Sequence, residues 1–115
     1  MDSILTSIKK LLGIDEAYEH FDTDITLHIN SVFMILHQLG VGPSKGFRIT
    51  GKSETWSSYT SNDETIEAVK TYVYLKVKLV FDPPLSSAVM EAMKSMINEL
   101  EWRLNVAAES KTSTD

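Results

Sequence analysis

The chain has 115 residues and a mass of 12.9 kDa, the size of one domain. Sixteen acidic against eleven basic residues give a formal net charge of −5, which argues against a dedicated nucleic-acid binder with a basic face. The chain has no cysteine, so disulfides, thiolate metal sites and cysteine nucleophiles are excluded. No apolar run approaches the length of about 20 residues that spans a bilayer, and we expect a soluble domain without a signal peptide.

The first part of the chain predicts two helices joined by an acidic connector. Apolar residues at positions 4, 5, 8, 11 and 12 repeat at three- and four-residue steps, and Gly13 follows as a C-cap. In the second helix, Asp22, Thr23 and Asp24 offer N-capping side chains, and Gly40 ends the apolar stripe. Four further residues widen this stripe, so we expect the helix to be buried or pressed against a neighbouring subunit: Leu27, Met34, Ile35 and Leu39.

Residues 40–62 form a long segment with a different composition. Five of its 23 residues are glycine or proline, and a segment of this length without periodicity is unusual in a compact domain unless it is functional. It also carries Phe47, Ile49, Trp56 and Tyr59, which a solvated linker would not need. Either these side chains anchor a partner surface, or they fold back onto the core of the domain.

The run from Asp63 to Phe81 fits two periodicities. Alternating apolar residues from 73 to 81 are typical of a strand, whereas Ile66, Val69, Val73 and further residues also make a helical stripe. The run is too long for a typical strand. We therefore favour a helix that begins at a capping box of Ser61 and Glu64 and ends at the prolines after Asp82.

The last element is predicted as a helix of five or six turns. Ser86 and Ser87 can cap it, and Glu99 precedes Arg103 by four residues, the favoured spacing for a surface ion pair. Residues 110–115 are polar and terminal, and we expect a flexible tail after a single helical domain of residues 1–109. The predicted fold class is all-α, a small bundle of about four helices with a long glycine-containing loop between the second and the third.

One segment matches a catalytic motif formally. Residues Gly46 to Ser53 satisfy the P-loop pattern, in which Lys52 would neutralise phosphates and Ser53 would hold magnesium. The pattern follows no buried strand and opens no apolar helix, so we interpret it as accidental; a small nucleotide-binding protein is nevertheless the enzymatic alternative. The three histidines and the acidic connector match no metal-site spacing, and we predict no catalytic residue, no cofactor and no metal.

Several strings in order along the chain resemble a known family. They are Leu11-Leu12-Gly13-Ile14 followed by Phe21-Asp22, the helix end Gln38-Leu39-Gly40-Val41-Gly42, Gly46-Phe47-Arg48-Ile49 with Trp56, Tyr72 to Pro84, and Glu99 to Asn105. Together they resemble the small head–tail connector, or adaptor, proteins of tailed bacteriophages and prophages, over roughly residues 1–109.

This resemblance implies a structural protein of the virion neck, made in the bacterial cytoplasm, with no enzymatic activity. It implies a ring of identical subunits, dodecameric, between the portal protein and a stopper or tail-completion protein, and without a membrane. Phage DNA would pass through the ring without sequence-specific binding. A helical interaction domain from outside viruses is a further alternative.

Eight residues are candidates for subunit or partner contacts. We expect the aromatic loop to meet a neighbouring subunit or the stopper, and the C-terminal tail to approach the portal. The candidates are Phe47, Ile49, Trp56, Tyr59, Trp102, Ser110, Lys111 and Thr112.

Overall fold

The computed structural model describes the backbone of residues 3–113 and the side chains of residues 3–109. Within this part of the chain every regular element is a helix, which confirms the all-α prediction with four substantial helices and a long intervening loop. The helices are α1 (Ile4–Leu11), α2 (Asp22–Gln38), α3 (Trp56–Tyr59), α4 (Asp63–Phe81) and α5 (Ser87–Ser113).

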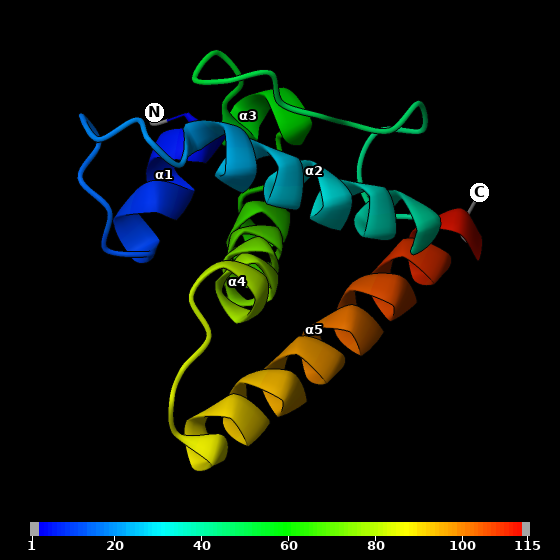
Figure 1. Cartoon of the computed structure of the whole chain (residues 1–115). Helices are drawn as coiled ribbons and strands as arrows, with labels where there is room; N and C mark the ends of the chain where they lie inside the picture. Colours follow the sequence, from blue (N-terminus) through cyan, green and yellow to red (C-terminus); the bar gives the residue numbers. More distant parts are fainter. Residues whose placement is uncertain (1–2, 114–115) are drawn as a thin grey trace.

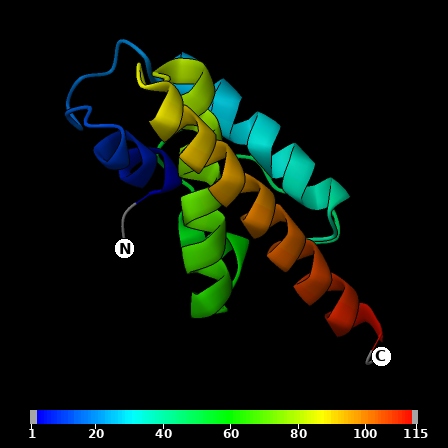
Figure 2. The ribbon, with the colours of Figure 1, turned by 90° about the horizontal axis from the view of Figure 1, so that it is seen from below.

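Helix α4 is the central element of the fold. It packs against α1, α2 and α5, and Figure 1 shows it almost end-on between α2 above and α5 below. The view from below in Figure 2 shows α5 crossing α4 at a steep angle. The helical interpretation of residues 63–81 is therefore confirmed, and the buried residues recur at helical spacing: Ile66, Val69, Tyr72, Val73, Leu75 and Val77.

The ends of the helices differ in part from the predicted caps. Asn62, not Ser61, caps α4, because its side-chain oxygen accepts a hydrogen bond from the backbone N–H of Thr65 at 2.9 Å. The predicted capping box of Ser61 and Glu64 was therefore wrong by one residue. Ser86 does cap α5, since its hydroxyl accepts from the backbone N–H of Val89 at 3.3 Å.

The loop between α2 and α4 folds back onto the helices and contains α3, a single turn that the sequence did not predict. The side chain of Asn30 on α2 forms two hydrogen bonds with the backbone of Ile49, at 2.7 and 2.9 Å. The backbone N–H of Ile4 donates to the carbonyl of Glu54 at 2.9 Å, which ties the loop to the start of α1. The loop is therefore a fixed part of the domain.

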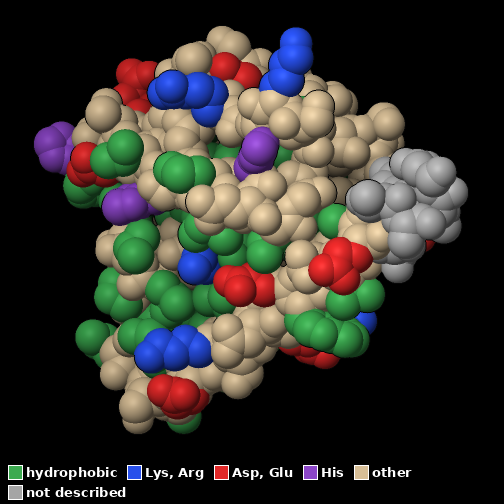
Figure 3. Space-filling view, turned by 90° about the vertical axis from the view of Figure 1, so that its right-hand side faces the viewer, with side chains coloured by type: hydrophobic (Ala, Val, Ile, Leu, Met, Phe, Trp, Pro, Cys, Tyr) green, Lys and Arg blue, Asp and Glu red, His purple; other side chains and the backbone are tan. Residues whose placement is uncertain are grey.

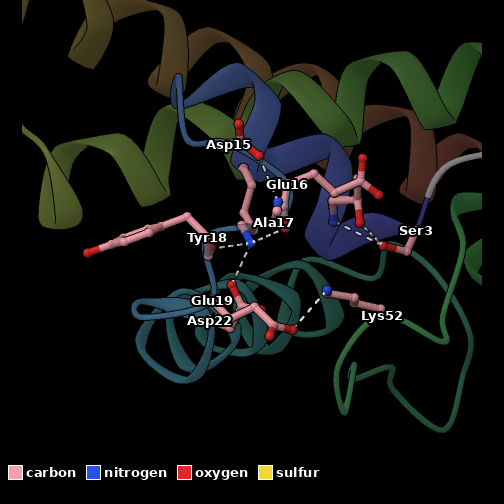
Figure 4. A network of polar contacts seen from close by, with 10 residues as sticks. Ser3, Asp15, Glu16, Ala17, Tyr18, Glu19, Asp22 and Lys52 are labelled. Atoms are coloured by element: carbon pink, nitrogen blue, oxygen red, sulfur yellow. Dashed lines mark hydrogen bonds and ion pairs between the residues drawn. The ribbon is translucent and has the colours of Figure 1, made fainter.

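The connector between α1 and α2 is held by one buried ammonium group. Lys9 is 1% exposed, and its Nζ donates to the backbone carbonyls of Glu16 and Tyr18 at 3.1 and 2.7 Å. The same Nζ lies 2.7 Å from a carboxylate oxygen of Asp22, and Figure 4 shows this network. Asp22 was predicted as an N-cap of α2, but Phe21 occupies that position without a side-chain cap, and Asp22 binds Lys9 instead.

We predict that replacing Lys9 by methionine destabilises the fold by about 2 kcal/mol. The substitution preserves the apolar stem but leaves two carbonyls and a partly buried carboxylate without their donor. The free energy of unfolding from urea denaturation measures the effect. Lys94→Met is the matched control, because the ion pair of Lys94 with Glu91, at 4.0 Å, is exposed to water. Equal stability of the two variants would contradict the role given to Lys9.

Candidate subunit and partner interfaces

The outward face of α2 forms an apolar groove with the loop beside it. Leu27 and Met34 are seven residues apart on this helix, opposite its buried residues, and are 65% and 61% exposed. The groove has a volume of about 560 Å³ and Phe47 forms part of its wall, with Lys45 and Arg48 beside it. The groove is also lined by Asn30, Ser31 and His37. Neither Lys45 nor Arg48 forms an ion pair within the described residues, so the groove has a basic rim. We call this surface the α2 groove.

The second half of α5 carries a different stripe on its outward side. Trp102 is 66% exposed and Val106 is also exposed, four residues further along the helix. Glu99 and Glu109 lie on the same side, three residues before Trp102 and three after Val106, and both are exposed. Glu99 accepts a hydrogen bond from Arg103 at 3.0 Å, the pair expected from the sequence. We call this surface the α5 stripe; its apolar centre is flanked by the Glu99–Arg103 pair on one side and by Glu109 on the other.

The first half of α5 leaves further apolar side chains uncovered. Met93 and Ile97 pack in the core, whereas Val89 and Met96 are about half exposed and Leu85, just before the helix, is fully exposed. Figure 3 shows hydrophobic side chains in the lower half of one face, where α5 lies, interspersed with charges of both signs. Exposed apolar patches of this kind are typical of surfaces that meet other proteins.

Three of the four loop residues expected at an interface lie inside the subunit. Ile49, Trp56 and Tyr59 are all buried, and the indole N–H of Trp56 donates to the hydroxyl of Ser7 at 2.8 Å. Of the two alternatives for these three side chains, the structure therefore supports the one in which they fold back onto the core. The loop packs Trp56 and Tyr59 against Phe33, so these side chains form part of the core and are not available as surface anchors. Phe47 is half-buried and reaches the wall of the α2 groove.

The remaining candidates lie on α5. Trp102 is exposed, as a partner contact requires. Ser110, Lys111 and Thr112 belong to the last turn of α5 by their backbone, but their side chains lie outside the described residues, as does the end of the proposed tail.

The sequence indicated some of the residues on these surfaces and missed others. Leu27 and Met34 were noted in the sequence for widening the stripe of α2. Lys45, Arg48 and Val106 were missed, because single residues of these types carry no signal.

The segment that matches the P-loop pattern does not have the geometry of one. No strand precedes Gly46 and no helix begins at Lys52 in the described part of the chain. The Nζ of Lys52 lies 3.1 Å from a carboxylate oxygen of Glu19, and this bond raises the pKa of the lysine. The hollow beside Lys52 is also lined by Glu19 and Asp22, whose carboxylates would repel a phosphate.

A comparison with family models identifies the chain. Residues 4–111 match the model described as phage connector protein, which covers almost the whole sequence. The chain belongs to the phage connector protein family. A search of curated proteins and a search of solved structures each found no match.

Membership confirms the family to which the sequence strings pointed. Phage connector proteins are structural components of the virion neck and have their partners at the junction of head and tail. In the described part of this connector, no helix combines the length and the apolar composition needed to cross a bilayer. The α2 groove and the outward sides of α5 are among the surfaces of the connector that carry exposed apolar side chains.

Tyr59 is an unusual feature of the connector's core. Its hydroxyl is buried with no hydrogen-bond partner among the described residues, and burial raises its pKa to about 12. A Cβ added to Gly42 would lie 2.6 Å from this hydroxyl oxygen, and Gly42 has a φ of +91°. Only glycine therefore fits at position 42, for both steric and conformational reasons.

We predict that truncation of Trp56 destabilises the fold strongly, whereas truncation of Trp102 changes its stability little. Trp56→Ala removes a ring that is 2% exposed, together with its hydrogen bond to Ser7. The free energy of unfolding should therefore fall by about 3–5 kcal/mol. Trp102→Ala should change stability by less than about 0.5 kcal/mol, because the free subunit does not bury this side chain. Thermal and urea unfolding of the two variants provide the comparison. A large loss of stability in Trp102→Ala would mean that this residue supports the fold.

We predict that Tyr59→Phe is at least as stable as the parent at pH 7, because it removes a buried hydroxyl that has no partner. In the parent, the raised pKa means that the folded state retains a proton that the unfolded state loses above about pH 10. The stability of the parent should therefore fall between pH 10 and 12, and the fall should be smaller in Tyr59→Phe.

Tyr72→Phe is the matched control for this substitution. The hydroxyl of Tyr72 donates to a carboxylate oxygen of Glu101 at 2.7 Å, so its removal should cost about 1 kcal/mol at pH 7. Urea denaturation at pH 7, 10 and 11.5 measures both effects. If Tyr59→Phe is as costly at pH 7 as Tyr72→Phe, the Tyr59 hydroxyl has a partner.

Proposed function

We propose that this protein is a head–tail connector subunit that forms a ring between the portal protein and a stopper or tail-completion protein. The ring is dodecameric and continues the channel through which phage DNA passes. The match to the connector family over residues 4–111 is the observation that carries the proposal. The protein acts by holding its partners together, and no residue is assigned a catalytic role.

The shape and the exposed surfaces of the subunit support a ring. The molecule is flat, with extents of 45 × 35 × 20 Å. A ring of identical subunits needs two different faces that fit each other, because each subunit contacts one neighbour on each side. The α2 groove and the α5 stripe belong to different helices and supply two such faces.

The charge of the subunit supports passage of DNA without adhesion. The net charge is −5, and attachment of a protein to DNA depends on neutralising phosphates with lysine and arginine. An acidic ring would weaken non-specific binding, so the DNA would slide through the channel. No sequence-specific contact is proposed.

The ends of the subunit are assigned to different partners in this proposal. The C-terminal end of α5, including Ser110, Lys111 and Thr112, meets the portal protein. Phe47 and the loop around it meet a neighbouring subunit or the stopper. In Figure 2 the C-terminal end of the α5 ribbon projects beyond α4.

We predict that phage lacking this protein produce DNA-filled heads without attached tails. The physical reason is that the portal would present no surface for the stopper or tail. Electron microscopy of particles from cells in which the gene is inactivated measures the outcome, and expression of the parent protein should restore tailed particles. Infectious, tailed particles in the absence of the protein would overturn the proposed function.

A further inference from the structure

We propose that the α5 stripe of one subunit lies in the α2 groove of the next subunit, with Trp102 as the central anchor. This inference rests on the proposed function and names the residues of the contact between copies. The occupant of the groove is a second copy of this chain. Three properties of the two surfaces lead to this assignment: their size, their charge and their position on the subunit.

The groove is large enough for the side chains of the stripe. Its volume of about 560 Å³ lies within the range of about 300–1,000 Å³ of pockets that enclose drug-sized molecules. An indole ring with a neighbouring valine side chain fits such a space. Leu27, Met34 and Phe47 give the groove apolar contacts for the ring, and a fully desolvated tryptophan is among the side chains that contribute most to protein interfaces.

The charges of the two surfaces are complementary. Lys45 and Arg48 line the groove beside its apolar side chains and form no ion pair within the described residues. Of the two acidic residues of the stripe, Glu99 is paired with Arg103 on the same helix, whereas Glu109, exposed three residues after Val106, forms no ion pair within the described residues. Docking that brings Glu109 towards the basic rim pairs unlike charges, which favours this orientation of one subunit on the next. The same rim would be poorly suited to a basic partner.

The position of the two surfaces favours a chain of subunits over a symmetric pair. The α2 groove is lined by α2 and the loop, whereas the α5 stripe lies on the outward side of the second half of α5, which passes the C-terminal end of α2 where Asn105 donates to the carbonyl of Leu39 at 3.1 Å. A contact between the groove of one copy and the stripe of another leaves a free groove and a free stripe at the two ends. Such a head-to-tail contact repeats, and it closes into a ring when the rotation between copies permits.

Cysteine pairs test the contact directly, because the chain has no cysteine of its own. One set of variants carries Leu27→Cys or Met34→Cys in the groove, and the other carries Glu99→Cys or Val106→Cys in the stripe. A groove variant and a stripe variant are mixed, assembled on the cognate portal protein and oxidised. We expect disulfide-linked dimers on non-reducing gels for at least one groove–stripe combination. Neither variant alone should give that dimer.

The control is Val80→Cys mixed with each stripe variant. Val80 lies on α4 outside the groove and is 63% exposed, close to the value for Met34. Incorporation into portal complexes is measured first by electron microscopy. If complexes form but no groove–stripe pair links, or if Val80→Cys links equally well, the contact is wrong and the proposed function stands. If the parent protein never joins the portal, the proposed function fails and the inference with it.

A second test uses the anchor itself. Trp102→Ala should reduce the number of copies bound per portal at least tenfold at a fixed protein concentration, while the melting temperature of the free subunit is unchanged. Val89→Ala removes an exposed apolar side chain from the other half of α5 and should leave binding within about twofold of the parent. Equal binding by Trp102→Ala and the parent would overturn the role of the stripe.

Discussion

The burial of Trp56 is the interaction on which the rest of the structure depends. Its ring packs near Phe33 of α2, and its indole N–H binds Ser7 of α1, so one side chain joins the loop to two helices. A chain of 115 residues without cysteine has few ways to complete a core, and the loop supplies the missing side. Because the loop is fixed, its outer residues form the wall of the α2 groove.

The helices were largely predictable, because their signals are local. The length of the run from Asp63 to Phe81 and the prolines after it decided between helix and strand. The exact capping residues could not be predicted, since Asn62 and Ser61 are both good capping residues and only the path of the chain selects one of them. The burial of Lys9 was also hidden, because a lysine in the last turn of a helix normally lies at the surface.

The orientation of the loop could not be predicted from its composition. Ile49, Trp56 and Tyr59 have no periodicity that would separate an inner from an outer face, so both interpretations fitted the sequence. The candidate interface was predictable in part. Leu27 and Met34 were visible as an excess of apolar residues on α2, and Trp102 was among the candidate contacts through the Glu99 to Asn105 string. Their relation depends on how α2 and α5 both pack against α4 and on where α5 passes the C-terminal end of α2.

The exposed Leu27 and Met34 have a consequence for heat resistance. These side chains remain in contact with water in the free subunit and would leave it only on assembly. Binding that involves only the folded form raises the apparent stability by mass action, so the midpoint of thermal unfolding would increase with protein concentration. The neck of a particle would then withstand temperatures at which an isolated subunit unfolds. Thermal endurance would be a collective property of the assembled copies.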